Sequence, residues 1–501
     1  MSGLRRATRR NETIDTTGST NYAKFATSAT DRTSERADDA TFATRPRVAW
    51  WLDPARLFAV LAIPLGLVYA LLTPPFQVPD ELRHLRRVVQ IAYGGVTGGT
   101  DIPASIDEFA KRAQADRRPR ARVARRAFSI DKLRELAAMP LEPERAVHFA
   151  GDRTLPYSPV VYLPAVAAVG VGRAVGARPL ALLYLARLAL LAGGVALVWW
   201  ALRLTPALAW PLCLLALLPM TTFLRSGLTA DTMTTGCALL FFALMLRAWR
   251  GAGPLSTSEL VALTAAGCVL ALCKQGYLPL TLGVLGIPRE RFATPRTRLV
   301  SLALMLGVPL LVSALWLASL DDWMWDNPRR ANPDVQLRML LENPRRFVEV
   351  LGATWLTPGR IWRLADTFVG RLLLLSVRPP TLVVVLCLAT LVALIAGDAT
   401  APSARIRERL LLLGAVLACI VVISLGAWIK WSTVGGAAIH GIQGRYLHPL
   451  VPFVALALVP PRAVRWRCSA RTAALLVVVV VGIANAVGLA GVVAATWAAS
   501  R

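Results

Sequence analysis

A short polar stretch, "PDELRH" (Pro79–His84), follows closely on the first long apolar segment of the sequence. It places two adjacent carboxylates, Asp80 and Glu81, and the imidazole of His84 where the chain would leave a lipid bilayer. Carboxylates can act as general bases or hold a divalent metal through their oxygens. On a helix Asp80 and His84 would share a face, with Glu81 turned away by roughly 100°. Asp80 and Glu81 are therefore candidate catalytic residues, and the alternative is a membrane-surface anchor.

Other ionisable side chains lie inside or beside apolar segments, where a charge is costly, and this predicts a common cavity. Asp231, at the end of the short loop "RSGLTAD", is a second acidic position and a candidate ligand for Mg²⁺ or Mn²⁺. Arginines suit phosphate because their planar forks bind its oxygens in pairs. Each basic residue also has a plainer explanation, as a side chain that reaches from a helix end to the interface. The candidate substrate-binding residues are His84, Arg187, Arg225, Lys274, Gln443, Arg445 and Tyr446.

The stretch "GIQGRYLHPL" (Gly441–Leu450) combines glycines with polar donors just before an apolar segment. Gly441 and Gly444 allow a close approach of backbone, while Gln443 and Arg445 present donors. We predict a binding site for phosphate or sugar here. A simple helix-entry turn is the alternative.

Composition identifies the class of protein. The 501 residues are 55% hydrophobic and 17% charged, with a mean hydropathy of +0.52. Apolar runs of about 17–25 residues recur, which is the length that crosses a hydrocarbon core of roughly 30 Å as a helix. We predict an all-α polytopic bundle of about eleven spans. Three of the spans we expect are a pair over 259–287, broken near Lys274, and a span over Arg371–Ala396.

The formal charge of +26 raises the question of nucleic acid. The arginines lie mostly in loops and tails beside apolar segments, which favours anionic lipids and orientation signals as their partners and argues against nucleic acid. The seven cysteines are an odd number and lie mostly in apolar segments, so neither a disulfide framework nor a zinc site is predicted. The sequence identifies no protein partner.

Four regions are predicted along the chain. Residues 1–47 form a disordered basic tail, and residues 48–501 form the membrane domain. Within that domain, 74–178 is a long first external loop and 321–370 a second one. The apolar stretch Tyr157–Gly176 is either a span or an interfacial helix. The interfacial alternative places the short basic loops on the side of the tail, as the positive-inside rule requires, with the N-terminus in the cytoplasm.

Four motifs carry a family resemblance: "PPFQVPDELRHL", "YSPVVYLP", "SGLTADTM" and "IHGIQGRYLHPLVP". They resemble an uncharacterised bacterial family of polytopic membrane proteins, a domain of unknown function grouped with the GT-C glycosyltransferases. The resemblance runs from about Leu57 to Pro460. It implies a GT-C-like fold, a polyprenyl-phosphate-linked sugar, and action on the extracytoplasmic face of the bacterial cytoplasmic membrane. It also implies that Asp80 or Glu81 matches the catalytic acidic position and Asp231 a second one, which binds metal in some members.

We expect no large C-terminal periplasmic domain, which is a departure from the GT-C resemblance. Three functions remain open. The first is transfer of a sugar from polyprenyl phosphate to a cell-envelope acceptor. The second is transport or flipping of lipid-linked saccharides, which the break near Lys274 favours although no internal repeat is visible. The third is a non-catalytic scaffold for envelope assembly.

Overall fold

The computed structural model describes residues 49–114, 128–320, 331–461 and 465–497. Residues 51–501 form one compact unit, and all that follows concerns that unit. The predicted tail of residues 1–47 lies outside the described residues. The helices, with 3-10 segments labelled η, are η1 Trp50–Leu52, α2 Pro54–Leu72, α3 Glu81–Ala92, α4 Ala104–Gln114, α5 Ile130–Ala138, η2 Pro159–Tyr162, α6 Leu163–Ala174, α7 Pro179–Leu204, α8 Ala209–Leu217, α9 Pro219–Ser226, α10 Ala230–Arg250, α11 Thr257–Cys273, η3 Gln275–Gly286, η4 Arg289–Arg291, α12 Pro295–Ala318, α13 Pro333–Glu342, α14 Pro344–Trp355, α15 Pro358–Val369, α16 Thr381–Gly397, α17 Ile406–Trp431, η5 Gly444–Leu450, α18 Val451–Leu458 and α19 Ala470–Thr496.

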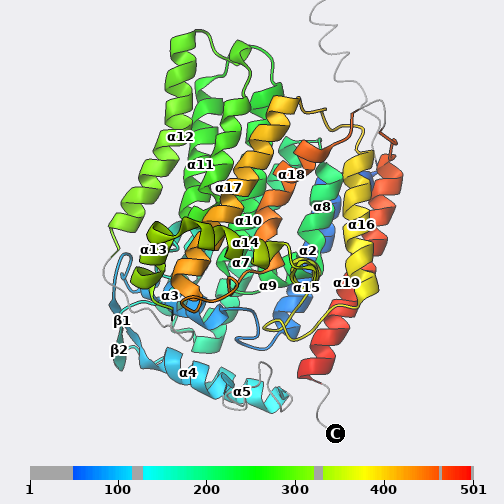
Figure 1. The fold of residues 1–501 in the computed structure, drawn as a ribbon. Helices are drawn as coiled ribbons and strands as arrows, with labels where there is room; N and C mark the ends of the chain where they lie inside the picture. The colour runs from blue at the N-terminus through cyan, green and yellow to red at the C-terminus, as the bar shows by residue number, and fades with distance from the viewer. Residues whose placement is uncertain (1–48, 115–127, 321–330, 462–464, 498–501) are drawn as a thin grey trace, which may run out of the picture. The chain divides into compact units, whose positions relative to one another are not determined.

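The long helices form a bundle around α10, while α12 lies at its edge (Figure 1). Close packing between α7 and α10 depends on a small residue, because a Cβ at Gly236 would meet the side chain of Leu197 at 2.9 Å. Strands β1 (Thr100–Pro103) and β2 (Ala146–Phe149) pair antiparallel, with Thr100 opposite Phe149. The prediction of a mostly helical membrane protein is confirmed.

Two breaks interrupt the bundle. Pro219 removes a backbone donor and disfavours a helical conformation at Leu218, so α8 and α9 meet at 60°. Lys274 is extended, with φ −164°, and it ends α11 before η3 begins. The break predicted near Lys274 is therefore confirmed.

The predicted start of the Arg371–Ala396 span is wrong. Helix α16 begins only at Thr381, after Pro379 and Pro380. The two prolines cannot extend a helix toward their N-terminal side. The residues before them form a turn in which Leu372 bridges Val377.

Among the described residues, six helices are long and apolar enough to cross a membrane, or seven if α8 and α9 form one bent span. The count of about eleven spans stays a prediction. The segment Tyr157–Gly176 contains η2 and α6, and α6 packs antiparallel along α7, with Pro164 near Gly193 and Gly172 near Leu182. Its interfacial position also stays a prediction.

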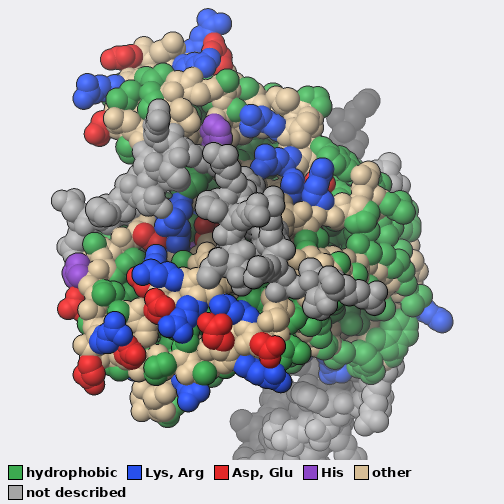
Figure 2. Space-filling model, turned by 90° about the horizontal axis from the view of Figure 1, so that it is seen from below, with side chains coloured by type: hydrophobic (Ala, Val, Ile, Leu, Met, Phe, Trp, Pro, Cys, Tyr) green, Lys and Arg blue, Asp and Glu red, His purple; other side chains and the backbone are tan. Residues whose placement is uncertain are grey.

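The two ends of the bundle differ. At one end, ion pairs link the ends of neighbouring helices. Arg250 pairs with Glu408 and Arg291 pairs with Glu259, both at 3.0 Å. The opposite end carries the β-hairpin, α3 to α5 and α13 to α15 (Figure 1). Seen from this end, charged side chains gather on one half, and hydrophobic side chains cover the half toward α16 and α19 (Figure 2).

A buried ion pair joins the segment that follows α2 to the bundle. Arg187 of α7 donates to Glu81 at 2.8 and 2.7 Å, and both side chains are fully buried. Arg187 also donates to the carbonyl oxygens of Ala70, Thr73 and Pro74, which the end of α2 leaves without helical partners. Glu81 accepts further bonds from the backbone N–H groups of Phe76 and Leu228. This network fixes the start of α3 against α2, α7 and the loop before α10.

We expect Glu81→Gln to destabilise the protein by about 3–5 kcal/mol, because it leaves the Arg187 charge buried without a counter-charge. The measurement is thermal and denaturant unfolding of the purified protein in detergent micelles. Glu108→Gln is the control, since Glu108 forms only an exposed pair with Arg112 on α4. If the two variants were equally stable, the Glu81–Arg187 pair would not make the expected contribution to the free energy of unfolding.

Candidate functional site

Asp80 faces outward from the network that holds Glu81. It precedes α3 in the left-handed backbone region, with φ 62°, a conformation that Asp tolerates better than most residues. Its carbonyl oxygen accepts bonds from the N–H groups of Arg83 and His84, which begins the helix. Its side chain is half exposed and lines a cavity. The structure thus separates the two predicted catalytic carboxylates, since Glu81 is enclosed and fully hydrogen-bonded.

A chain of alternating charges runs inward from Asp80. Its carboxylate lies 3.6 Å from Arg445, whose Nε lies 3.4 Å from the carboxylate of Asp231. Asp231, in the first turn of α10, also contacts Lys274 at 3.4 Å. These residues come from four separate parts of the sequence. All three distances exceed the usual N–H···O range of about 2.7–3.2 Å, so the ion pairs are loose.

Aromatic rings surround this chain of charges. The ammonium of Lys274 lies 4.2 Å from the ring centre of Tyr446, and the hydroxyl of Tyr277 donates to the carbonyl oxygen of Tyr446. His84 pairs with the hydroxyl of Tyr162 at 2.6 Å. Burial lowers the pKa of His84 below its ordinary value, although neighbouring carboxylates oppose the shift. Burial therefore favours the neutral imidazole, which can exchange a hydrogen bond without carrying charge.

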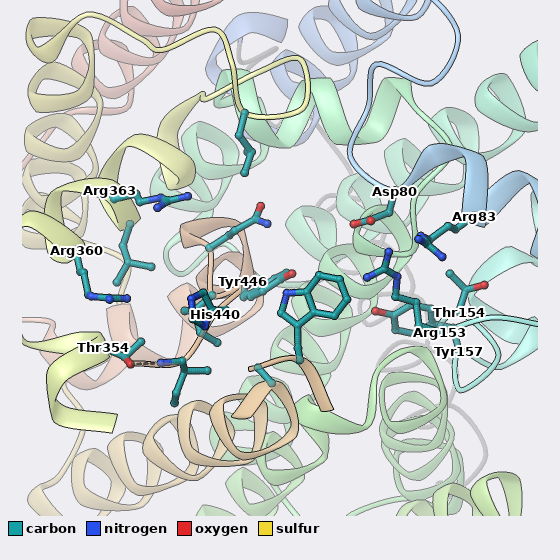
Figure 3. A pocket seen from close by; sticks show the side chains of 18 of the residues that line it. Asp80, Arg83, Arg153, Thr154, Tyr157, Thr354, Arg360, Arg363, His440 and Tyr446 are labelled. Carbon is teal, nitrogen blue, oxygen red and sulfur yellow. Dashed lines mark hydrogen bonds between the residues drawn. The ribbon is translucent and has the colours of Figure 1, made fainter. Parts of the chain in front are cut away.

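The cavity has a volume of about 690 Å³. In Figure 3, Asp80, Arg83, Arg153 and Tyr157 lie on one side of it, Arg360 and Arg363 lie across from them, and Tyr446 lies between. Arg83 pairs with Asp152 at 3.2 Å, and Arg153 stacks 4.2 Å from the ring centre of Trp431. Further lining residues are His84, Thr154, Thr354, Leu364, Leu375, Trp431, Ile439, His440, Ile442 and Gln443.

The predicted site residues fall into two groups. Asp80, His84, Gln443 and Tyr446 line the cavity, and Asp231, Lys274 and Arg445 lie directly behind it. Two others lie elsewhere. Arg187 is enclosed with Glu81, and Arg225 donates to the carbonyl oxygen of Ala216 beside a separate small cavity that Asp231 and His448 also line.

Sequence reasoning missed several cavity residues. Arg83 lies inside "PDELRH", beside the predicted residues Glu81 and His84, and Arg153 precedes the "YSPVVYLP" motif. Arg360 and Arg363 are spaced by one helical turn in "GRIWRLAD", a pattern that could have suggested a basic helix face. Trp431 ends an apolar helix, where an aromatic residue is ordinary.

The metal prediction can be compared with the side chains present. Among the described residues, no three His, Cys, Asp or Glu side chains come close enough to hold a metal ion. The carboxylate of Asp231 already faces two cations, those of Lys274 and Arg445. The donor set fits Mg²⁺ or Mn²⁺ poorly, and we derive no step through a metal.

Comparison with known proteins agrees with the class of this chain. No curated protein and no solved structure matches it. A family model described as "Predicted membrane protein (DUF2142)" matches residues 63–454, a range that contains Asp80, Asp231 and Arg445. That range is well over half of the 501 residues. The chain therefore belongs to the DUF2142 family of predicted membrane proteins.

Proposed function

We propose that this protein is a GT-C-type membrane glycosyltransferase that transfers a sugar from a polyprenyl-phosphate donor to a cell-envelope acceptor. The observation that carries the proposal is the half-exposed carboxylate of Asp80 in a cavity whose other charged lining residues are arginines. A single accessible base beside several guanidinium groups suits a reaction that removes a proton and releases a phosphate.

In the proposed reaction, Asp80 accepts the proton of an acceptor hydroxyl. The hydroxyl oxygen then bonds to the anomeric carbon of the sugar, and the bond from that carbon to the phosphate oxygen breaks. The electron pair leaves with the polyprenyl phosphate, whose charge the arginines stabilise. Direct displacement of this kind inverts the anomeric configuration.

The other site residues have supporting roles in this proposal. Arg445 orients Asp80, and Asp231 with Lys274 orients Arg445. Gln443 has a buried Oε1 that accepts no hydrogen bond among the described residues, so it can accept one from a sugar hydroxyl. His84 and Tyr446 contact the substrate from the same wall. Glu81 and Arg187 are positioning residues that hold the start of α3.

The proposed orientation places the cavity on the extracytoplasmic face of a bacterial cytoplasmic membrane. The ion-paired basic connections at the other end of the bundle then face the cytoplasm, as does the N-terminus. About eleven spans of a GT-C-like fold and an interfacial α6 belong to the same proposal. Anionic lipids would contact the exposed basic side chains at both interfaces.

Transport or flipping of a lipid-linked saccharide is the second candidate. The break at Lys274 and the bend between α8 and α9 favour it, because discontinuous helices form the binding sites of many transporters. The two functions differ in chemistry, since a flippase needs no base. Replacement of Asp80 therefore distinguishes them.

We expect Asp80→Asn to lower the transfer rate by about 10²–10⁴-fold, because an amide cannot accept the acceptor's proton. Asn also tolerates the left-handed backbone, so the fold is preserved. The measurement is pulse-labelling and mass analysis of envelope glycans in a deletion strain that carries the variant at normal protein level. Asp107→Asn, which alters an ion pair with Arg86 in the same loop, is the control. Full complementation by Asp80→Asn would leave a flippase or a scaffold.

We expect Arg445→Lys to lower the same rate by roughly tenfold or more. Lysine keeps the charge but loses the planar fork that reaches both Asp80 and Asp231. Arg471→Lys, at the exposed start of α19, is the matched control and should be silent. If both variants are silent, Arg445 is only part of a structural turn.

Cysteine labelling tests the orientation. Cysteines are placed at the exposed positions Glu144 and Arg296. Glu144 precedes β2 at the end that carries the β-hairpin, and Arg296 follows η4 at the end where Arg291 pairs with Glu259. In a background with Cys268 and Cys468 replaced by serine, an impermeant thiol reagent should label intact cells at position 144 and not at position 296. The reverse pattern would place Asp80 on the cytoplasmic side and contradict the proposed reaction.

A further inference from the structure

The α15 wall of the cavity carries two arginines that have no acidic partner among the described residues. Arg360 and Arg363 are exposed, lie one helical turn apart and both line the cavity. Neither forms an ion pair with any described residue. The basic residues across the cavity are engaged, since Arg83 pairs with Asp152 and Arg153 stacks on Trp431. Of these four arginines, Arg360 and Arg363 are therefore the two whose charge is available to a ligand.

Helix α15 is held rigidly at its C-terminal half. The N–H of Gly444 donates to the hydroxyl of Thr367 at 2.7 Å, and a Cβ at position 444 would collide with the backbone of Leu364. Asp366, buried in the same half, accepts a bond from Arg378 at 2.9 Å. The guanidinium groups of Arg360 and Arg363 thus project from a helix that is already held in place. Anion binding therefore has a small entropic cost for ordering that helix.

Helices α14 and α15 carry exposed apolar side chains. Leu356, between the two helices, is 75% exposed, and Ile361 is 49% exposed. Val348 and Trp362 are exposed on the same two helices. On α15 the apolar side chains of Ile361 and Trp362 point away from the face that bears Arg360 and Arg363. Apolar side chains beside basic ones are typical of helices that lie in a bilayer interface.

We propose that Arg360 and Arg363 bind the phosphate headgroup of an amphiphilic phosphate monoester that enters the cavity laterally from the lipid leaflet over α14 and α15. Two guanidinium forks one turn apart can each bind a pair of phosphate oxygens. The exposed apolar surface favours a phosphate with a hydrocarbon chain over a soluble one. The inference rests on the proposed function only in identifying this monoester as the polyprenyl phosphate that transfer releases from the donor, because binding requires no transfer.

This position also agrees with the proposed displacement. The base Asp80 lies across the cavity from α15 (Figure 3). A sugar between them would meet the acceptor hydroxyl on the Asp80 side and release its phosphate on the side of Arg360 and Arg363. Gln443 and Tyr446 line the cavity that the sugar would occupy.

The test measures binding of farnesyl phosphate to the full chain in nanodiscs of neutral lipid, by native mass spectrometry and by competition with a fluorescent analogue. The variant is the double substitution Arg360→Gln, Arg363→Gln. The control is Arg345→Gln, Arg346→Gln, which removes the same charge from α14 at residues that pair with Glu349. We expect about tenfold to hundredfold weaker binding in the variant and no change in the control. Equal affinity of the two proteins would overturn the proposal.

Two further arms define the ligand. Farnesol, which lacks the phosphate, and inorganic phosphate, which lacks the chain, should each compete at least about a hundredfold more weakly. Competition by inorganic phosphate at equal strength would overturn the lateral lipid route. Asp80→Asn should bind farnesyl phosphate normally while losing transfer. If the protein does not transfer a sugar, the binding result for Arg360 and Arg363 still stands. If these arginines do not bind the phosphate, the transfer result for Asp80 still stands.

Discussion

The pairing of Glu81 with Arg187 constrains the whole functional end of the molecule. A guanidinium buried in the middle of packed helices requires a counter-charge, and Glu81 supplies it while it also accepts bonds from two backbone N–H groups. Arg187 in turn satisfies the carbonyl oxygens that the end of α2 leaves open. Because Glu81 is fixed inward, its neighbour Asp80 is directed elsewhere, and its side chain lines the cavity. The position of the accessible carboxylate thus follows from the burial of the inaccessible one.

The second constraint is electrostatic. Asp80, Arg445, Asp231 and Lys274 alternate in sign, so each buried charge lies beside an opposite one and none is left uncompensated. The ion pairs are long and Arg445 has few other partners. A ligand can therefore replace one of these ion pairs without leaving a buried charge isolated. In contrast, the Glu81–Arg187 network is short, saturated and closed to exchange.

Much of the fold could be predicted from the sequence, because helices in lipid have a fixed minimum length and a nearly uniform apolar composition. The apolar segments, the break at Lys274 and the gathering of polar motifs at one end follow from those rules. The sequence could not reveal that Asp80 and Glu81 have opposite environments, since that depends on Arg187, more than 100 positions away. The spacing of Arg360 and Arg363 could have suggested a basic helix face, but it could not show that this face lines a cavity, because an arginine that faces a cavity has the same local pattern as one that faces water. The start of α16 was mispredicted because the leucines before Pro379 are apolar enough for a span although they fold as a turn.

The contact between Gly444 and α15 has a consequence for how the cavity can vary. Backbone touches backbone there, so the separation between the wall that bears Arg360 and the segment that bears Arg445 is set by main-chain atoms. Substitutions among the lining side chains can change the polarity or shape of the cavity, but they cannot widen it. Related proteins that keep a glycine at this position should therefore accept ligands of one length between phosphate and reacting carbon, and should differ in which ring they accept.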